Sequence, residues 1–352
     1  MLAKGQANKP GSDVIVFTNG DQLAGHFVRS TGSSVTFKSD ALGDLTIDWK
    51  IVKELRTSEK VAVIRKGVKL RKHQDTAAVP EGTLSVANQS VQLAPATPTI
   101  PLSETAVIVG QPDFEKAMTT GPGILQDWKG AITAGATLVR ATQNDETFTG
   151  ALSLVRAEPS ENWLNPSNRT SFNLSESYGE VTQPGAPSIK TSIFHGDAER
   201  DEYVSGAIFA FGAAAFDHNS TQGLDLEQTY AGGIGWTVIN GAAQTFDVKG
   251  SMSYMRQQFQ TGPTQDLVGS VFAEHYTRKL PRKVVFDEHA AVTPAWNNTN
   301  AYSAAFGAMI TLPVFKRLSA STGVIDSYLN DPPPAFKKNS FQFTLGLTYS
   351  LQ

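Results

Sequence analysis

The segment that decides the fold reads Ser340-Phe341-Gln342-Phe343-Thr344-Leu345-Gly346-Leu347-Thr348-Tyr349-Ser350-Leu351. Large apolar side chains occupy every second position, and small or uncharged polar residues occupy the positions between them. This strict alternation predicts an extended strand with one apolar face and one polar face. Strands of globular proteins usually have ~5 to 6 residues, whereas a tilted strand that crosses a bilayer needs ~9 to 11. The length of this segment therefore favours a membrane strand.

Eleven further segments upstream show the same alternation. They are Trp128–Arg140, Asp145–Arg156, Arg169–Tyr178, Ile189–Asp197, Tyr203–Phe216, Leu226–Val238, Gln244–Gln257, Leu267–Arg278, Lys283–Thr293, Tyr302–Leu312 and Leu318–Tyr328. An even number of antiparallel strands can close into a ring without an exposed edge, as lipid requires. We therefore predict an all-β fold with an antiparallel transmembrane β-barrel of about 12 strands.

The connections between these segments also distinguish a membrane barrel from a soluble double sheet, which is the alternative. Turns after even-numbered segments are mostly short, connections after odd-numbered segments are often longer, and Trp and Tyr residues gather near segment ends, as in outer-membrane barrels. The connection that contains Pro159 and Pro166 departs from this trend.

One short turn is expected at residues 198–202, where several carboxylates crowd together. We interpret it as a solvated turn, with a calcium site as the alternative.

The chain divides into three regions. Residues 1–93 contain brief strands separated by turn signals such as Asn19-Gly20, and they predict a small, SH3-like, all-β periplasmic domain. Residues 94–126 are punctuated by five prolines and predict an extended linker. Residues 127–352 form the predicted barrel.

Composition excludes several functional classes. The chain has 352 residues, with 30 Lys and Arg against 33 Asp and Glu, so the basic surface of a nucleic-acid-binding protein is missing. It has no Cys, which excludes disulfides, thiol nucleophiles and Cys-ligated zinc. The first residues lack the apolar core of a secretory signal, so we expect either a cytoplasmic chain or one given without its leader.

The C-terminal strand carries a second pattern. Thr344, Gly346, Tyr349 and Leu351 resemble the polar-x-Gly-x-x-aromatic-x-hydrophobic assembly signal of bacterial outer-membrane barrels, although the chain ends one residue later, at Gln352. The resemblance implies that the barrel assembly machinery and outer-membrane lipid are partners. The partner of residues 1–93 stays unknown.

Two stretches of the barrel region resemble a known family. They are Trp128-Lys129-Gly130 with Ala134-Gly135-Ala136 and the turn from Arg140 through Gln143 to Asp145, and the closing hairpin from Asp326 through Pro332-Pro333-Pro334 to Asn339. Both are similar to the salt-induced outer-membrane protein family, a domain of unknown function. The front segment, with Asn19-Gly20-Asp21 and Ile47-Asp48-Trp49, looks like the small β module that often precedes this barrel. The resemblance implies an outer-membrane location in a Gram-negative bacterium and no known reaction.

The search for chemistry yields few candidates. The six His residues form no tight ligand spacing, and we predict neither a metal nor a cofactor. His275 and His289 are the candidate residues for a barrel hydrolase. Lys129, Asp247, Lys249 and Arg256 are candidate charges of the barrel lumen.

These observations support three functional hypotheses. The leading one is a non-enzymatic outer-membrane barrel with a structural, envelope-stress or osmotic-stress role. The first alternative is a narrow diffusion channel for small solutes, because the inner face is small and hydroxylic. The second alternative is a barrel hydrolase that uses His275 or His289.

Overall fold

The computed structural model describes residues 12–39, 42–74, 76–95, 98–120, 123, 125–140, 144–159, 161, 163–182, 185 and 187–351, with the side chains of residues 137–140 and 144–145 left out. The chain forms two compact units, one of residues 1–122 with 159–165 and one of residues 123–158 with 166–352. The expected turn at Gln143 lies outside the described residues.

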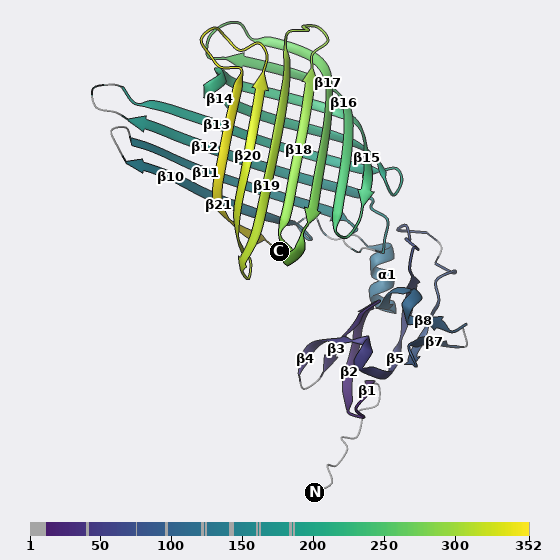
Figure 1. Ribbon diagram of the computed structural model, residues 1–352. Coiled ribbons are helices and arrows are strands. Elements are labelled where there is room, and N and C mark those ends of the chain that lie inside the picture. Colours follow the sequence, from purple (N-terminus) through teal and green to yellow (C-terminus); the bar gives the residue numbers. More distant parts are fainter. Residues whose placement is uncertain are drawn as a thin grey trace. The chain divides into compact units, whose positions relative to one another are not determined.

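The second unit is a closed barrel in which each strand pairs antiparallel with its neighbours in sequence and β21 pairs with β10 (Figure 1). Its strands are β10 (Lys129–Arg140), β11 (Asn144–Glu158), β12 (Asn168–Thr182), β13 (Ile189–Tyr203), β14 (Ile208–Asn219), β15 (Leu224–Asn240), β16 (Gln244–Phe259), β17 (Gln265–Lys279), β18 (Val285–Pro294), β19 (Tyr302–Phe315), β20 (Leu318–Leu329) and β21 (Asn339–Leu351). Short 3-10 helices follow β14 and β17: η3 (Ser220–Gln222) and η4 (Pro281–Lys283). The predicted all-β fold with a 12-stranded barrel is confirmed.

The alternation of β21 has the expected physical consequence. Phe343, Leu345 and Leu347 are exposed on the outer face of the barrel. On the inner face, the hydroxyl of Thr348 donates to Ser321 Oγ at 3.0 Å and lies 2.9 Å from Thr133 Oγ1 of β10. The strand thus presents apolar side chains outward and joins its neighbours through a hydroxyl ladder inside.

Strand β13 is longer than the sequence analysis predicts. The expected turn at residues 198–202 is wrong, because β13 continues to Tyr203 and the chain reverses only where the Val204 amide donates to the Ile208 carbonyl. The alternation of this strand persists through Asp197, Glu199 and Asp201, which share one face. A cluster of carboxylates is typical of a solvated turn, but these residues keep the two-residue period of a strand.

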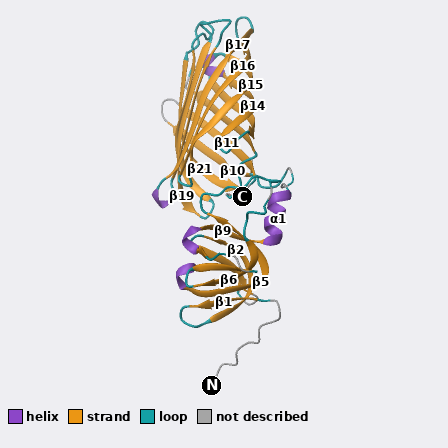
Figure 2. Cartoon of the chain, turned by 90° about the vertical axis from the view of Figure 1, so that its right-hand side faces the viewer, coloured by secondary structure: helices purple, strands orange, loops and turns teal. Residues whose placement is uncertain are grey.

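The first unit is a nine-stranded sheet of order β4-β3-β2-β1-β5-β6-β7-β8, with β9 paired to β2 and β5. Its elements are β1 (Asp13–Phe17), β2 (Gln22–Thr31), β3 (Ser34–Ser39), β4 (Gly43–Asp48), η1 (Trp49–Ile51), β5 (Val52–Arg65), β6 (Glu81–Ala87), β7 (Ser90–Ala94), β8 (Ile100–Pro101), η2 (Leu102–Glu104), β9 (Thr105–Gly110) and α1 (Gln111–Thr119). Figure 2 shows how little of the chain is helical. No helix in the described part of the chain is long and apolar enough to cross a membrane. An SH3-like shape is not confirmed.

The stretch predicted as a linker, residues 94–126, contains β8, β9 and α1 instead. Strand β9 supplies Ile108 to the core of the sheet, and α1 supplies Phe114 to a second hydrophobic cluster of the same unit. Proline density misled the prediction, because Pro112 lies in the first turn of α1, where a missing N–H is tolerated.

The first unit also takes residues 159–165 from the connection between β11 and β12. Trp163 and Leu164 are 3% exposed, and the Trp163 ring stacks on Phe114 with 5.5 Å between ring centroids. The Leu70 amide donates to the Trp163 carbonyl at 3.1 Å, and the Asn165 amide donates to the Leu70 carbonyl at 2.7 Å. This role explains why the connection with Pro159 is longer than the other turns at its rim.

Candidate functional site

The inner face of the barrel is the candidate site, and strand β16 shows how the sequence builds it. Its odd-numbered residues, including Asp247 and Lys249, face inward, and its register with β17 runs without a bulge. Arg256 therefore has the opposite orientation and is exposed on the outer face, so it is not a lumen charge. Lys129 is exposed at the first position of β10.

A first ion-pair bridge crosses part of the lumen. Arg169 Nε of β12 lies 2.6 Å from Asp201 Oδ2 of β13, and Arg169 Nη1 lies 2.7 Å from Asp247 Oδ2 of β16. The guanidinium also lies over the ring of Phe209, 5.3 Å from its centroid. Since β12 and β16 are not neighbours, this bridge spans the interior as a chord.

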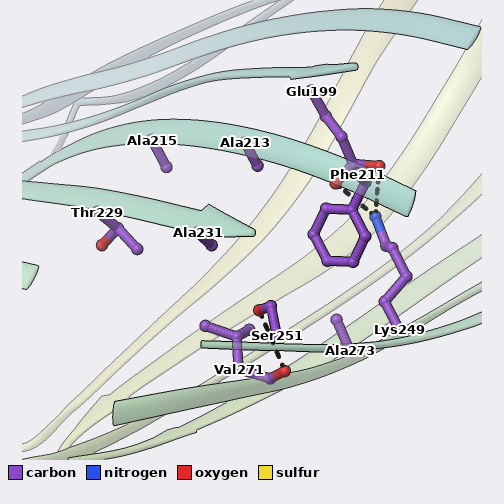
Figure 3. Close-up of a pocket in the computed structure, with 10 residues that line it drawn as sticks. All are labelled: Glu199, Phe211, Ala213, Ala215, Thr229, Ala231, Lys249, Ser251, Val271 and Ala273. Carbon is purple, nitrogen blue, oxygen red and sulfur yellow. Dashed lines mark hydrogen bonds and ion pairs between the residues drawn. The ribbon is translucent and has the colours of Figure 1, made fainter. Parts of the chain in front are cut away.

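A second bridge lies beside the first. Lys249 Nζ of β16 donates to both carboxylate oxygens of Glu199 of β13 at 2.8 Å, and Figure 3 shows this pair beside Phe211. The ammonium lies 5.5 Å from the centroid of the Phe211 ring. A cavity of about 140 Å³ adjoins the pair, with small residues along most of its wall. The other lining residues are Ala213, Ala215, Thr229, Ala231, Ser251, Val271 and Ala273.

Glycines on β15 allow two close approaches, one of them by the Phe209 ring beneath the first bridge. A Cβ added to Gly235 would lie 2.2 Å from the ring of Phe209, and one added to Gly233 would lie 2.1 Å from the carbonyl oxygen of Gly250. Only a residue without a side chain allows Phe209 to pack this closely against the neighbouring strand. Gly235 therefore gives Phe209 the space that it occupies beneath Arg169.

Further along the lumen, His195 of β13 lies between two carboxylates. Its Nδ1 lies 2.6 Å from Asp217 Oδ1, and its Nε2 lies 3.0 Å from Asp197 Oδ1. Asn173 of β12 donates its side-chain amide to both oxygens of Asp197. The His195 side chain is still 44% exposed, so water reaches this level of the interior.

The two histidines singled out in the sequence lie on paired strands of the barrel. His275 of β17 lies directly opposite His289 of β18 in the strand register. His275 Nε2 lies 2.9 Å from Asp287 Oδ2, and the hydroxyl of Thr277 donates to the same oxygen at 2.7 Å. The side chains of His275 and Asp287 are 48% and 42% exposed.

The opposite wall of the lumen carries uncharged groups, most of them small or hydroxylic. Its inward residues on β20 and β21 are Ser319, Ser321, Gly323, Ile325, Ser327, Gln342, Thr344, Gly346, Thr348 and Ser350. The described interior is thus asymmetric: ion pairs concentrate on β12 to β18, and uncharged groups line β20 and β21.

Two loops meet over one opening of the barrel. Gln222, in the turn between β14 and β15, donates its amide to the Ser327 carbonyl at 3.0 Å and to the Lys338 carbonyl at 2.7 Å. Six strands, β15 to β20, separate the connections β14–β15 and β20–β21 in one direction around the ring. The other six strands separate them in the opposite direction. Their contact therefore crosses the opening. We call residues 220–223 and 330–338 the strap.

The proposed assembly-signal residues lie at the closing seam. Tyr349 pairs with Ile132 and Leu351 with Gly130 of β10, while Thr344 and Gly346 face the interior. Within the part of the chain that the structure describes, no group of three or more His, Asp or Glu side chains is arranged to hold a metal ion.

Sequence reasoning found Asp247 and Lys249 but missed the residues that they contact. Arg169, Glu199 and Asp201 lie at inward positions near strand ends, where alternation alone could have assigned them to the lumen. Their pairing across the interior depends on the curvature of the closed sheet, which has no local signal.

Comparison with known proteins places the barrel in a family. A family described as "Protein of unknown function, DUF481" matches residues 132–351. No curated protein matches the chain significantly.

Several solved structures are similar to the barrel. The NanC porin has a TM-score of 0.37 and 9% identity, over 63% of this chain and 100% of that one. The translocator domain of the autotransporter NalP from Neisseria meningitidis has a TM-score of 0.36 and 11% identity, over 63% of this chain and 87% of that one. An outer-membrane channel from Pseudomonas putida F1 has a TM-score of 0.36 and 10% identity, over 64% of this chain and 95% of that one.

Proposed function

Because the chain belongs to the DUF481 family of unknown function, we propose its role from its own geometry: a non-enzymatic, narrow diffusion channel for small hydrophilic solutes in the outer membrane of a Gram-negative bacterium. Apolar residues such as Phe343 and Leu345 cover the outer face of the barrel. A surface of this kind suits hydrocarbon, and a closed barrel leaves no unpaired edge there.

The observation that carries the channel proposal is the exposure of charged side chains inside the barrel. His195, His275 and Asp287 face inward, yet each is more than 40% exposed. A packed interior would bury such groups, because desolvating a charge is costly. This exposure leaves room for water in this part of the lumen, and we propose that small solutes share the same space.

A hydrolase is disfavoured by the geometry at His275. A nucleophile relay needs one imidazole nitrogen for the carboxylate and the other for the attacking hydroxyl. Here Asp287 and the Thr277 hydroxyl both approach the same atom, His275 Nε2, at 2.9 and 3.5 Å. The pair is better suited to line an aqueous passage.

A structural role in the envelope is the second candidate, and the strap favours it. Gln222 is 3% exposed, and Phe336 packs against Gly223, where an added Cβ would lie 2.7 Å from the ring. A strap held this firmly would close the opening, and a channel requires it to move aside.

Liposome swelling separates the two candidates. Vesicles that contain the folded, full-length protein are diluted into isotonic solutions of sugars of increasing size. Swelling with the smallest sugars and none with larger ones is expected for a narrow channel. Vesicles that stay impermeable to every solute would support the structural role.

Under this proposal the strap opening faces outward. Strand β10 begins and β21 ends at the same rim, because the number of strands is even. The first unit precedes β10 and would then lie in the periplasm, with the strap at the cell surface.

A further inference from the structure

We propose that the two bridges, Arg169–Asp201–Asp247 and Lys249–Glu199, together with Phe209 and Phe211, form the constriction that sets the size limit of the passage. This inference rests on the proposed channel function and adds the residues that determine which solutes pass. It follows from the position, rigidity and surroundings of the bridges.

The two bridges cross the interior of the barrel. Among the ion pairs described in the barrel, most join adjacent strands or residues of one strand, as His275–Asp287 does. The Arg169–Asp247 pair joins β12 to β16, and the Lys249–Glu199 pair joins β16 to β13. Pairs between non-neighbouring strands of a closed ring must cross its interior, so these side chains reduce the open cross-section.

All members of the first bridge lie near the same rim. Arg169 is the second residue of β12, Asp201 lies two residues before the end of β13, and Asp247 is the fourth residue of β16. This rim is the one where β10 begins and β21 ends. The constriction therefore lies at the opening opposite the strap.

Several contacts hold the side chains of the first bridge in place. Arg169 is held by two carboxylates and by the face of the Phe209 ring, which attracts the cation. Asp201 and Asp247 are almost fully buried, at 1% and 5% exposure. Breaking a buried pair leaves an uncompensated charge, so the side chains cannot swing out of the path as free surface residues would.

Open space remains beside the second bridge. The wall beside the Lys249–Glu199 pair is built mainly from alanines, with Thr229, Ser251 and Val271, and it leaves a cavity of about 140 Å³, which is large enough for several waters. The opposite wall of β20 and β21 carries serines and threonines. Space thus remains next to the bridges, and the bridges determine how much.

The test compares single-channel conductance and polymer exclusion of full-length protein in planar bilayers. The variant Glu199→Ala/Lys249→Ala removes one bridge without changing the net charge. The matched control, Arg256→Ala/Asp266→Ala, removes an opposite-charge pair that faces outward on β16 and β17. A second variant, Phe211→Ala, removes only the ring. Heat-modifiable migration on a gel confirms that each protein is folded.

The constriction predicts that the bridge variant conducts about twofold more than wild type and admits a larger polymer, with a smaller increase for Phe211→Ala and none for the outer-face control. Equal conductance and equal polymer cut-off for conducting wild type and bridge variant would overturn the constriction and leave the channel standing. If neither folded protein conducts, the channel proposal itself fails, and the constriction fails with it.

Discussion

The lipid-facing side of β21 makes a quantitative prediction. Leu345 is the central residue of this 13-residue strand, with six residues on each side, and it is 61% exposed on the outer face. If the barrel spans a membrane, this position lies near the middle of the hydrocarbon layer. An arginine there loses its hydration, so Leu345→Arg should lower the free energy of unfolding by about 2 to 4 kcal/mol.

The neighbouring residue provides the control. Thr344 faces the lumen, where its hydroxyl donates to the Gly323 carbonyl at 3.4 Å. An arginine at this position can extend into the aqueous interior, so Thr344→Arg should cost less than half as much. Urea unfolding of both variants in lipid vesicles, followed by the gel shift between folded and unfolded forms, gives the two values. Equal costs at the two positions would refute the assignment of faces to lipid and water.

Three further predictions concern other parts of the chain. Trp163→Ala should destabilise the first unit by ~3 to 5 kcal/mol, since it removes a buried ring, and limited proteolysis in urea should then cleave that unit first. In this Cys-free chain, Thr221→Cys/Ser340→Cys should form a disulfide that holds the strap in place, because the native hydroxyl oxygens lie 3.2 Å apart. Oxidation of this variant should block the swelling of vesicles in sugar solutions, and reduction should restore it. A membrane-impermeant thiol reagent should label Ala335→Cys but not Glu59→Cys on intact cells, and the reverse pattern would invert the proposed topology.

The barrel could be predicted because its determinants are local. In β21 the polarity of each residue indicates which face of the sheet it occupies, as Leu345 and Thr348 show. The two-residue period is a property of the strand itself and does not depend on its neighbours. Where composition was used in place of period, the prediction failed. The cluster of acidic residues led to a predicted turn inside β13. The many prolines led to a predicted linker where the structure has β9 and α1.

The site was predicted only in part, for a related reason. Alternation assigns Lys249 to the inner face but says nothing about which of the other inward residues it contacts. The bridge to Glu199 depends on the curvature of three intervening strand pairs, and the packing of Phe209 beneath Arg169 depends on the absence of a side chain at Gly235. Likewise, the role of Trp163 in the first unit follows from packing between segments far apart in sequence.

Insertion of the barrel into a membrane is the premise of both the channel and its constriction. The decisive measurement is refolding of the denatured full-length chain in plain buffer and, in parallel, in detergent micelles, followed by heat-modifiable gel migration and size exclusion. We expect a compact, heat-modifiable barrel only with micelles, because residues such as Phe343 and Leu347 would otherwise face water. A monodisperse chain with a folded barrel in plain buffer would contradict the membrane assignment and, with it, the channel and its constriction.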